Sequence, residues 1–188
     1  MSFFPAYFNL KNRKILLIGG GDIALEKLEK LVDFTEKITV IAKEVSPDFQ
    51  NFASLHKIAI EKRAYLKGDI LNYDIVIVAT DTITLHKAIY EESRTTRVLV
   101  NSVDDTAYCD FIFPSYIKKG DLTISVSTSG TSPAMAKRLR IYLESIIPPA
   151  IEPFLREMKE LRKSLPKGKK RMKFFEEKSD EFMNKYFK

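Results

Sequence analysis

The sequence has few of the residues that cross-link a small protein or bind a metal. Cys109 is the single cysteine among 188 residues, so no disulfide forms within the chain. The two histidines, His56 and His86, stand alone and no CxxC or HxxxH spacing occurs, so we expect no permanently bound metal. There is also no G-x-S-x-G motif and no cysteine–histidine pair that would indicate a nucleophile.

Long apolar runs are lacking as well. No stretch approaches the roughly 20 apolar residues of a membrane span, and residues 1–10 lack the basic and apolar regions of a signal peptide. We therefore predict a cytoplasmic protein with no membrane partner. Hydrophobic residues make up 45% and charged residues 30% of the chain, which excludes a disordered protein and allows a real core.

The net charge of +6 is concentrated at the C-terminal end. Residues 156–188 carry 12 Lys/Arg against 6 Asp/Glu, whereas the rest of the chain is balanced. Such a segment attracts an acidic small molecule, anionic lipid or nucleic acid, or is simply a solvated helical face. Because the basic residues are not interleaved with aromatic ones and no zinc-finger spacing occurs, we expect no nucleic-acid partner.

Short apolar runs alternate with amphipathic stretches over residues 14–101. The runs predict strands at 14–18, 38–42, 58–60, 74–79 and 98–100, and the amphipathic stretches predict helices at 23–32 and 84–93. This alternation predicts an α/β fold with a Rossmann-like parallel sheet that is covered on both faces.

The pattern changes after residue 101. Residues 111–114 and 122–127 predict two strands around a turn at 117–121, and Ser132-Pro133 predicts the start of a helix that runs to about residue 147. Residues 150–188 are helical in pattern, with a break at 166–168. We therefore predict an NAD-binding Rossmann domain at 1–113, a central α+β region at 114–147 and a C-terminal helical region at 148–188.

A glycine-rich loop of the form G-x-G-x-x-A follows the first predicted strand. Gly19 permits the tight turn, Gly21 lets the backbone approach a pyrophosphate, and Ala24 lets the helix pack closely on the strand. The free N–H groups at the start of the helix, where Asp22 and Ile23 lie, bind anions well. The loop therefore predicts a dinucleotide site.

Two further segments follow the second and fourth predicted strands at the same edge of the sheet. Lys43 suits the 2′-phosphate of NADP, whereas Glu44 suits the ribose 2′-hydroxyl of NAD, so these residues alone leave NAD and NADP open. Thr80 and Asp81 follow the fourth strand, beside the expected cofactor crevice. We predict that all four residues contact the cofactor.

The order and spacing of the motifs resemble those of the precorrin-2 dehydrogenases, a family that also forms the N-terminal module of siroheme synthase. The motifs are FPAYFNL at 4–10, GGGDIA at 19–24, ATD at 79–81, N-x-V-D at 101–104, FIFP at 111–114 and TSP at 131–133. The resemblance covers about residues 3–147. It implies oxidation of precorrin-2, an acidic tetrapyrrole, to sirohydrochlorin with NAD as hydride acceptor, and a homodimer paired through the central region. Some members also insert ferrous iron, so a bifunctional dehydrogenase and ferrochelatase, with iron as a substrate, is the first alternative.

Asp104 is the candidate catalytic residue. It follows a strand at the carboxyl edge of the sheet, where catalytic groups of such folds lie, and it matches the aspartate that is the proposed general base of the resembling proteins. We interpret its neighbour Asp105 as a turn residue. Asn101 either orients the substrate or caps the loop.

The loop before the helix at 133–147 is the second candidate binding segment. Thr128, Ser129, Gly130 and Thr131 offer hydroxyl and N–H groups to a substrate carboxylate, and Lys137 offers a cation on the helix that follows. We expect Ser132 to be the N-cap. Thr128 stands where the multifunctional relatives have a regulatory serine, and whether it regulates this chain stays open.

An alternative of another class is a nucleotide-sensing Rossmann module without catalysis. Such a module needs only the glycine loop, and an Asp104→Asn variant would then behave like the parent protein.

Overall fold

The computed structural model describes residues 3–103 and 105–187, and the chain divides into two compact units after Ile112. The first unit contains a parallel sheet of β1 (Ile15–Ile18), β2 (Ile38–Ala42), β3 (Ala59–Lys62), β4 (Ile75–Val78) and β5 (Leu99–Ser102). The strand order is β3-β2-β1-β4-β5. Successive strands extend outward in opposite directions from β1, so the sheet has a topological switch point between β1 and β4.

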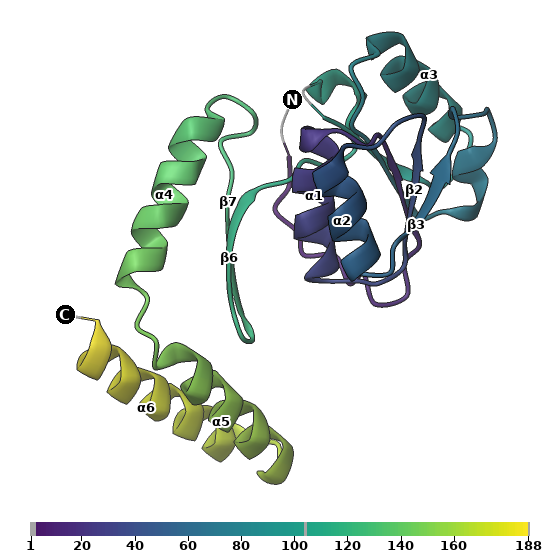
Figure 1. Ribbon diagram of the computed structural model, residues 1–188. Helices are drawn as coiled ribbons and strands as arrows, with labels where there is room; N and C mark the ends of the chain where they lie inside the picture. The colour runs from purple at the N-terminus through teal and green to yellow at the C-terminus, as the bar shows by residue number, and fades with distance from the viewer. Residues whose placement is uncertain (1–2, 104, 188) are drawn as a thin grey trace. The chain divides into compact units, whose positions relative to one another are not determined.

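Helices cover the sheet. On one face, α1 (Asp22–Val32) and α2 (Pro47–Leu55) lie side by side (Figure 1). The other face packs against α3 (Ile83–Ser93) and a short 3₁₀ helix, η1 (Asp69–Asn72). Two covered faces explain why every residue of β1 and β4 is buried, since central strands of such sheets lie between two apolar layers.

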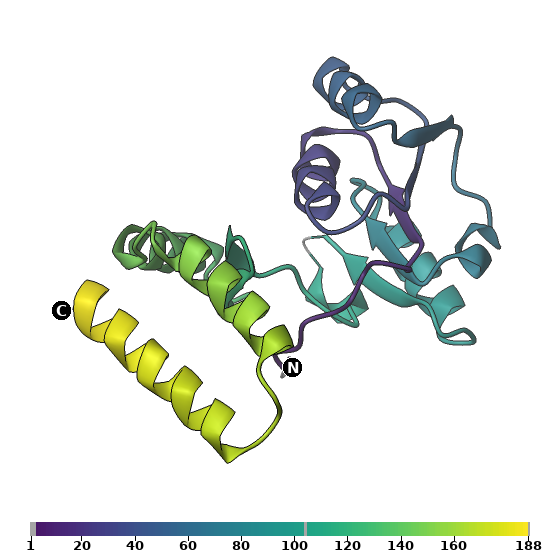
Figure 2. The ribbon, with the colours of Figure 1, turned by 90° about the horizontal axis from the view of Figure 1, so that it is seen from below.

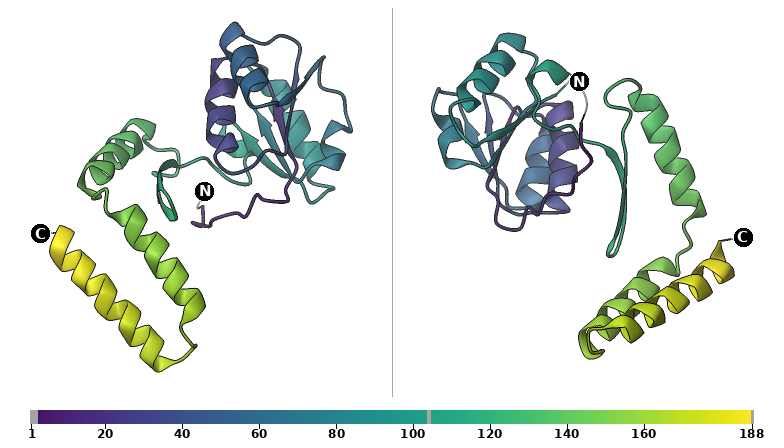
Figure 3. Two further views of the ribbon diagram at one scale, coloured as in Figure 1. Left: turned by 60° about the horizontal axis from the view of Figure 1, so that its bottom comes forward. Right: turned by 180° about the vertical axis from the view of Figure 1, so that it is seen from behind.

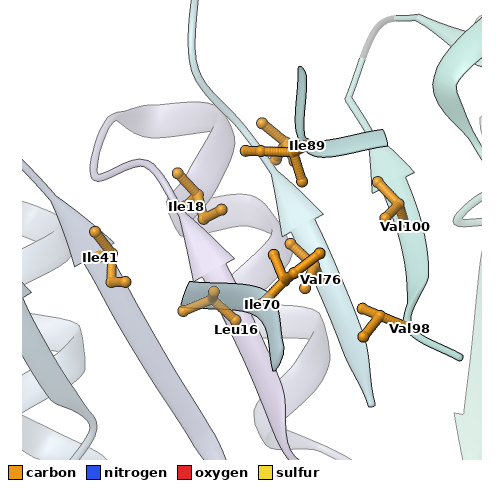
Figure 4. Packing of buried hydrophobic residues seen from close by; sticks show 9 residues of the cluster. Leu16, Ile18, Ile41, Ile70, Val76, Ile89, Val98 and Val100 are labelled. Atoms are coloured by element: carbon orange, nitrogen blue, oxygen red, sulfur yellow. The ribbon is translucent and has the colours of Figure 1, made fainter. Parts of the chain in front are cut away.

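Alternate residues of the strands supply the two halves of this core. Leu16, Val76 and Val100 point to the same face and pack with Ile70 of η1 and Ile89 of α3, as Figure 4 shows. Their neighbours along each strand point the opposite way, toward the face that α1 and α2 cover. This packing fixes the register of the strands and holds the loops that follow them at the carboxyl edge of the sheet.

The second unit is a hairpin with three helices. The strands β6 (Ser115–Lys119) and β7 (Leu122–Val126) are antiparallel, and α4 (Pro133–Ile146) lies along them (Figure 1). The helices α5 (Ile151–Ser164) and α6 (Lys169–Tyr186) run antiparallel to each other (Figures 2 and 3). The rings of Phe154 and Phe182 stack between them with centroids 4.3 Å apart. No helix in the described part of the chain is long and apolar enough to cross a membrane.

Most predicted elements are confirmed to within two residues, and the main differences concern α2 and the hairpin. Helix α2 was not predicted, although Ser46 caps it and Pro47 opens it, the same signal that indicated α4. The strand expected at 111–114 was wrong, because the hairpin begins only at Ser115. The turn expected at 117–121 was also wrong in its bounds, because β6 continues to Lys119 and β7 begins at Leu122. Pro114 has no N–H to donate to a ladder, and the carbonyl of Phe111 accepts instead from the amide of Asn101.

Candidate functional site

A cavity of about 650 Å³ lies at the carboxyl edge of the sheet, at the switch point. Four segments line it, namely residues 18–24 from the end of β1, 41–44 from the end of β2, 63–65 after β3 and 79–82 after β4, together with Leu85 and Val103. The structure brings all eight predicted cofactor residues to this cavity: Gly19, Gly21, Asp22, Ile23, Lys43, Glu44, Thr80 and Asp81. Its volume is in the range of about 300–1,000 Å³ that small-molecule sites occupy.

The three glycines of the loop face different surroundings. Gly19 has φ +126°, and a Cβ there would lie 2.1 Å from the carbonyl oxygen of Ala79. A Cβ on Gly20 would lie 2.4 Å from the carbonyl oxygen of Glu44. A Cβ on Gly21 would meet no described atom within 4 Å. The first two glycines therefore pack the loop against neighbouring backbone, whereas Gly21 leaves open space where a ligand is able to reach the chain.

Helix α1 begins at this open point. Gly21 is its N-cap, and within the described residues no side chain caps the helix there. The N–H of Leu25 is bonded to the carbonyl of Gly21 at 2.9 Å, so the N–H groups of Asp22, Ile23 and Ala24 precede the first intrahelical bond. Free N–H groups and the positive end of the helix dipole fit the pyrophosphate of a dinucleotide.

The cavity also has two lining residues that the sequence did not indicate. Arg63 pairs with Asp69 at 2.6 Å and with Glu61 at 2.7 Å, and these hydrogen bonds, that to Asp69 foremost, raise the pKa of Arg63. Tyr65 donates to Glu92 at 2.7 Å, and burial first, then this bond, raises its pKa. Neither residue belongs to a motif. Glu61 and Asp69 lie two and six residues from Arg63, whereas Glu92 lies 27 residues from Tyr65.

The end of β5 forms another wall. Val103 lines the cavity and its N–H donates to the carbonyl of Val78 at 2.9 Å. Asp104, the predicted base, lies outside the described residues. Asp105 caps the 3₁₀ helix η2 (Thr106–Tyr108) by accepting from the N–H of Ala107 at 3.0 Å, so its interpretation as a turn residue is confirmed.

The segment after η2 is tied back against β5. The buried amide of Asn101 donates to the carbonyl of Phe111 at 2.8 Å, which favours its loop-holding interpretation. The N–H of Ser102 donates to the sulfur of Cys109 at 3.2 Å, and burial raises the pKa of that thiol. The carboxylate of Asp110 accepts from the N–H of Val100 at 2.8 Å. The residues that flank position 104 are therefore held by bonds on both sides.

The other predicted substrate residues lie in the second unit. Thr128 accepts from the N–H of Ser132 at 3.0 Å, and Ser132 in turn caps α4, as predicted, by accepting from Met135. Ser129 and Gly130 have φ 52° and 84°, so the loop turns through the left-handed region between Thr128 and Thr131. Lys137 is exposed on α4. Thus the predicted substrate set, unlike the cofactor set, is divided between the two units.

Among residues 3–103 and 105–187, no group of three or more His, Cys, Asp or Glu side chains is placed to hold a metal ion.

The sheet order and the glycine loop at the switch point define a dinucleotide-binding protein of the Rossmann class. Residues 6–115 match the family described as "Putative NAD(P)-binding", and residues 119–145 match "Sirohaem biosynthesis protein central". The first match covers more than half of the chain, so the chain belongs to the family of putative NAD(P)-binding proteins. Together with the second match, it confirms the resemblance stated from the motifs.

Individual relatives agree with this assignment. The chain is 35% identical over 153 residues to a siroheme synthase of Pseudoalteromonas translucida, which covers 81% of this chain and 32% of the relative. It is 37% identical over 148 residues to a siroheme synthase of Psychrobacter cryohalolentis, and this match covers 79% of this chain and 28% of the relative. The chain thus spans about a third of the length of these relatives. The solved structure of SirC, a precorrin-2 dehydrogenase, shares the fold, with a TM-score of 0.77, 24% identity and coverage of 90% of this chain and 85% of that one.

Proposed function

We propose that this chain is an NAD-dependent dehydrogenase that oxidises precorrin-2 to sirohydrochlorin in siroheme synthesis. The observation that carries the proposal is the cavity at the switch point, which eight predicted cofactor residues line together with Val103, the residue before Asp104. The names of the relatives, siroheme synthase and precorrin-2 dehydrogenase, support the choice of substrate.

The residues divide the work of this reaction. The N–H groups at the start of α1 and the open backbone at Gly21 bind the pyrophosphate. Bound NAD supplies the acceptor for the hydride that leaves the macrocycle. Asp104 takes the proton that leaves the macrocycle with this hydride, so that two electrons and two hydrogens are removed in total. The bonds that hold β5 to residues 109–111 keep the backbone on either side of this base in place.

We propose NAD rather than NADP as the preferred nucleotide. Lys43 and Glu44 lie exposed at the end of β2, and the nearby positive charge of Arg63 is already matched by Asp69 and Glu61. A 2′-phosphate would gain only Lys43 and would meet the charge of Glu44, whereas a 2′-hydroxyl donates to Glu44. We expect Glu44→Ala to weaken NAD binding and to reduce the preference over NADP, and titration with both nucleotides tests this.

We further propose that the chain forms a homodimer through α4. The helix leaves Met135, Leu139, Tyr142 and Ile146 exposed at helical spacing on one stripe, and Tyr142 is 62% exposed. Tyr142→Glu is expected to halve the mass measured by sedimentation, while Lys137→Glu on the same helix is the matched control. A parent protein that sediments as a monomer would contradict this proposal. The cytoplasmic location and the ferrochelatase activity stay predictions.

The decisive experiment mixes the protein with anaerobically prepared precorrin-2 and NAD, NADP or neither, and follows the absorbance of sirohydrochlorin. We expect oxidation with NAD, and a loss of at least about 100-fold in kcat for Asp104→Asn with unchanged NADH binding. Asp105→Asn is the matched control and should retain its turnover. Ferrous iron added in a second stage tests the bifunctional alternative. Nucleotide binding without any oxidation would favour the nucleotide-sensing module instead.

A further inference from the structure

His86 is a buried residue that the proposed chemistry leaves unused. It lies in α3, is 3% exposed, and has a partner for each ring nitrogen. Its Nδ1 is 2.5 Å from the hydroxyl of Ser102, and its Nε2 is 2.8 Å from the carbonyl oxygen and 3.1 Å from the hydroxyl of Thr80. The ring thus joins α3 to the loop after β4 and to the last residue of β5.

The partners determine where the proton of the neutral ring lies. A carbonyl oxygen only accepts hydrogen bonds, so Nε2 must carry the hydrogen that it donates to Thr80. In the neutral ring, Nδ1 then holds a lone pair and accepts from the hydroxyl of Ser102. Among the described residues, no buried side-chain nitrogen or oxygen lacks a hydrogen-bond partner, and buried networks that are satisfied in this way specify one geometry.

The two ends of the network lie at the candidate site. Thr80 lines the nucleotide cavity. Ser102 precedes Val103, which lines the same cavity, and stands two residues before Asp104. The backbone of Ser102 is held from a second direction, since its N–H donates to the sulfur of Cys109 and its carbonyl accepts from that thiol at 3.1 Å. The His86 ring therefore bridges two walls of one cavity through side-chain bonds, in addition to the backbone ladder that pairs β4 with β5.

We propose that His86 is a positioning residue for the nucleotide and for the reaction. Through Thr80 it fixes the wall of the nucleotide cavity, and through Ser102 it fixes the end of the strand that leads to the catalytic segment. The second half of the proposal rests on the proposed dehydrogenase function, whereas the first half requires only that the cavity binds the nucleotide.

Two amide variants separate the two bonds. The amide of glutamine reaches the position of Nε2, so His86→Gln retains the bond to Thr80 and loses that to Ser102. The shorter asparagine reaches the position of Nδ1, so His86→Asn retains the bond to Ser102 and loses that to Thr80. We expect His86→Asn to raise the Kd for NADH about tenfold, as the loss of one buried hydrogen bond does. We expect His86→Gln to keep this Kd within about twofold and to lower kcat about tenfold.

Ser102→Ala provides an independent variant outside the helix. It removes the same bond as His86→Gln, so it should also lower kcat and leave the Kd for NADH within about twofold. Thermal unfolding is measured for all three variants. If His86→Asn and His86→Gln fail to fold, Ser102→Ala still decides the half of the proposal that concerns the reaction, because a kcat equal to that of the parent would overturn that half.

A merely structural role for His86 gives a different result. In that case the Kd, kcat and melting temperature would change in parallel in both amide variants, and the proposal would be wrong. A parent protein that binds NADH but does not oxidise precorrin-2 would refute the proposed function. The part of the proposal that concerns Thr80 and nucleotide binding would still be tested, because it requires that His86→Asn weakens NADH binding and that His86→Gln does not.

Discussion

The two units of this chain bury their apolar residues to different degrees. In the first unit, β1 and β4 are buried along their whole length between two helical layers. In the described part of the second unit, the buried hydrophobic residues are Ile117, Ala136, Ile147, Phe175 and Phe182, while α4 exposes a stripe of large side chains. The first unit therefore contains its own complete core, whereas the second presents an apolar surface of the kind that protein partners cover.

One ion pair of the first unit is less exposed than two pairs of the basic C-terminal segment. Arg63 and Asp69 form a partly buried pair that holds the segment after β3 against η1. The basic C-terminal segment contains two exposed pairs, each between residues three positions apart within a helix. Lys163 pairs with Glu160 in α5, and Lys178 pairs with Glu181 in α6. Exposed pairs contribute about 0–1 kcal/mol each, so these two fit a solvated helical face better than a binding surface.

The largest expected effect comes from Gly19→Ala, which breaks the core of the first unit at its tightest point. The added Cβ meets the Ala79 carbonyl at 2.1 Å in a conformation with φ +126°, so we expect a loss of about 3 kcal/mol or more in the free energy of unfolding. Urea unfolding measures this loss. Gly21→Ala is the matched control, because it should weaken NADH binding while the stability stays close to that of the parent.

A smaller effect on the free energy of unfolding is expected when one leucine in each unit is replaced by alanine. Leu17 is fully buried in β1, so Leu17→Ala should cost about 3 kcal/mol at any protein concentration. Leu139 is 42% exposed, so Leu139→Ala should cost less than about 1 kcal/mol in the monomer. Unfolding curves at two protein concentrations test the comparison. Equal costs for both variants at low concentration would show that the second unit is as well packed as the first.

The smallest effect concerns the pH dependence of stability. The hydrogen bond from Arg63 lowers the pKa of Asp69, so folding favours the charged carboxylate. This contribution is fully present above the unfolded pKa of about 3.9 and is lost as the pH falls through the lower folded pKa. We expect Asp69→Asn to be less stable than the parent at pH 7 and to lose less stability than the parent below about pH 4.

Asp121→Asn is the control for this pH dependence. It removes an exposed pair with Lys159 in the second unit, and the unfolding of the first unit should not change. A parent and an Asp69→Asn variant with the same stability at pH 7 and at pH 3 would contradict the prediction.

Much of the site was predictable because its signals are local. The glycine loop, the Lys43-Glu44 pair and the Thr80-Asp81 pair each follow a strand directly, and strand ends of a parallel sheet meet at one edge. Arg63 and His86 could not be predicted in this way. Arg63 is held by Asp69 of η1, and His86 is held by Thr80 and Ser102. These partners belong to other elements of the fold, so the contacts form only when the chain folds.

The sequence by itself determined the α/β class, the position of the nucleotide loop and the family, because hydrophobic period and motif spacing are properties of neighbouring residues. The tertiary structure alone decided which glycines lack room for a side chain, which cations are already paired, and that a buried histidine joins two walls of the cavity. The physical reason is that close packing and hydrogen-bond satisfaction depend on atoms of different strands, helices and loops, which only folding brings within reach of each other.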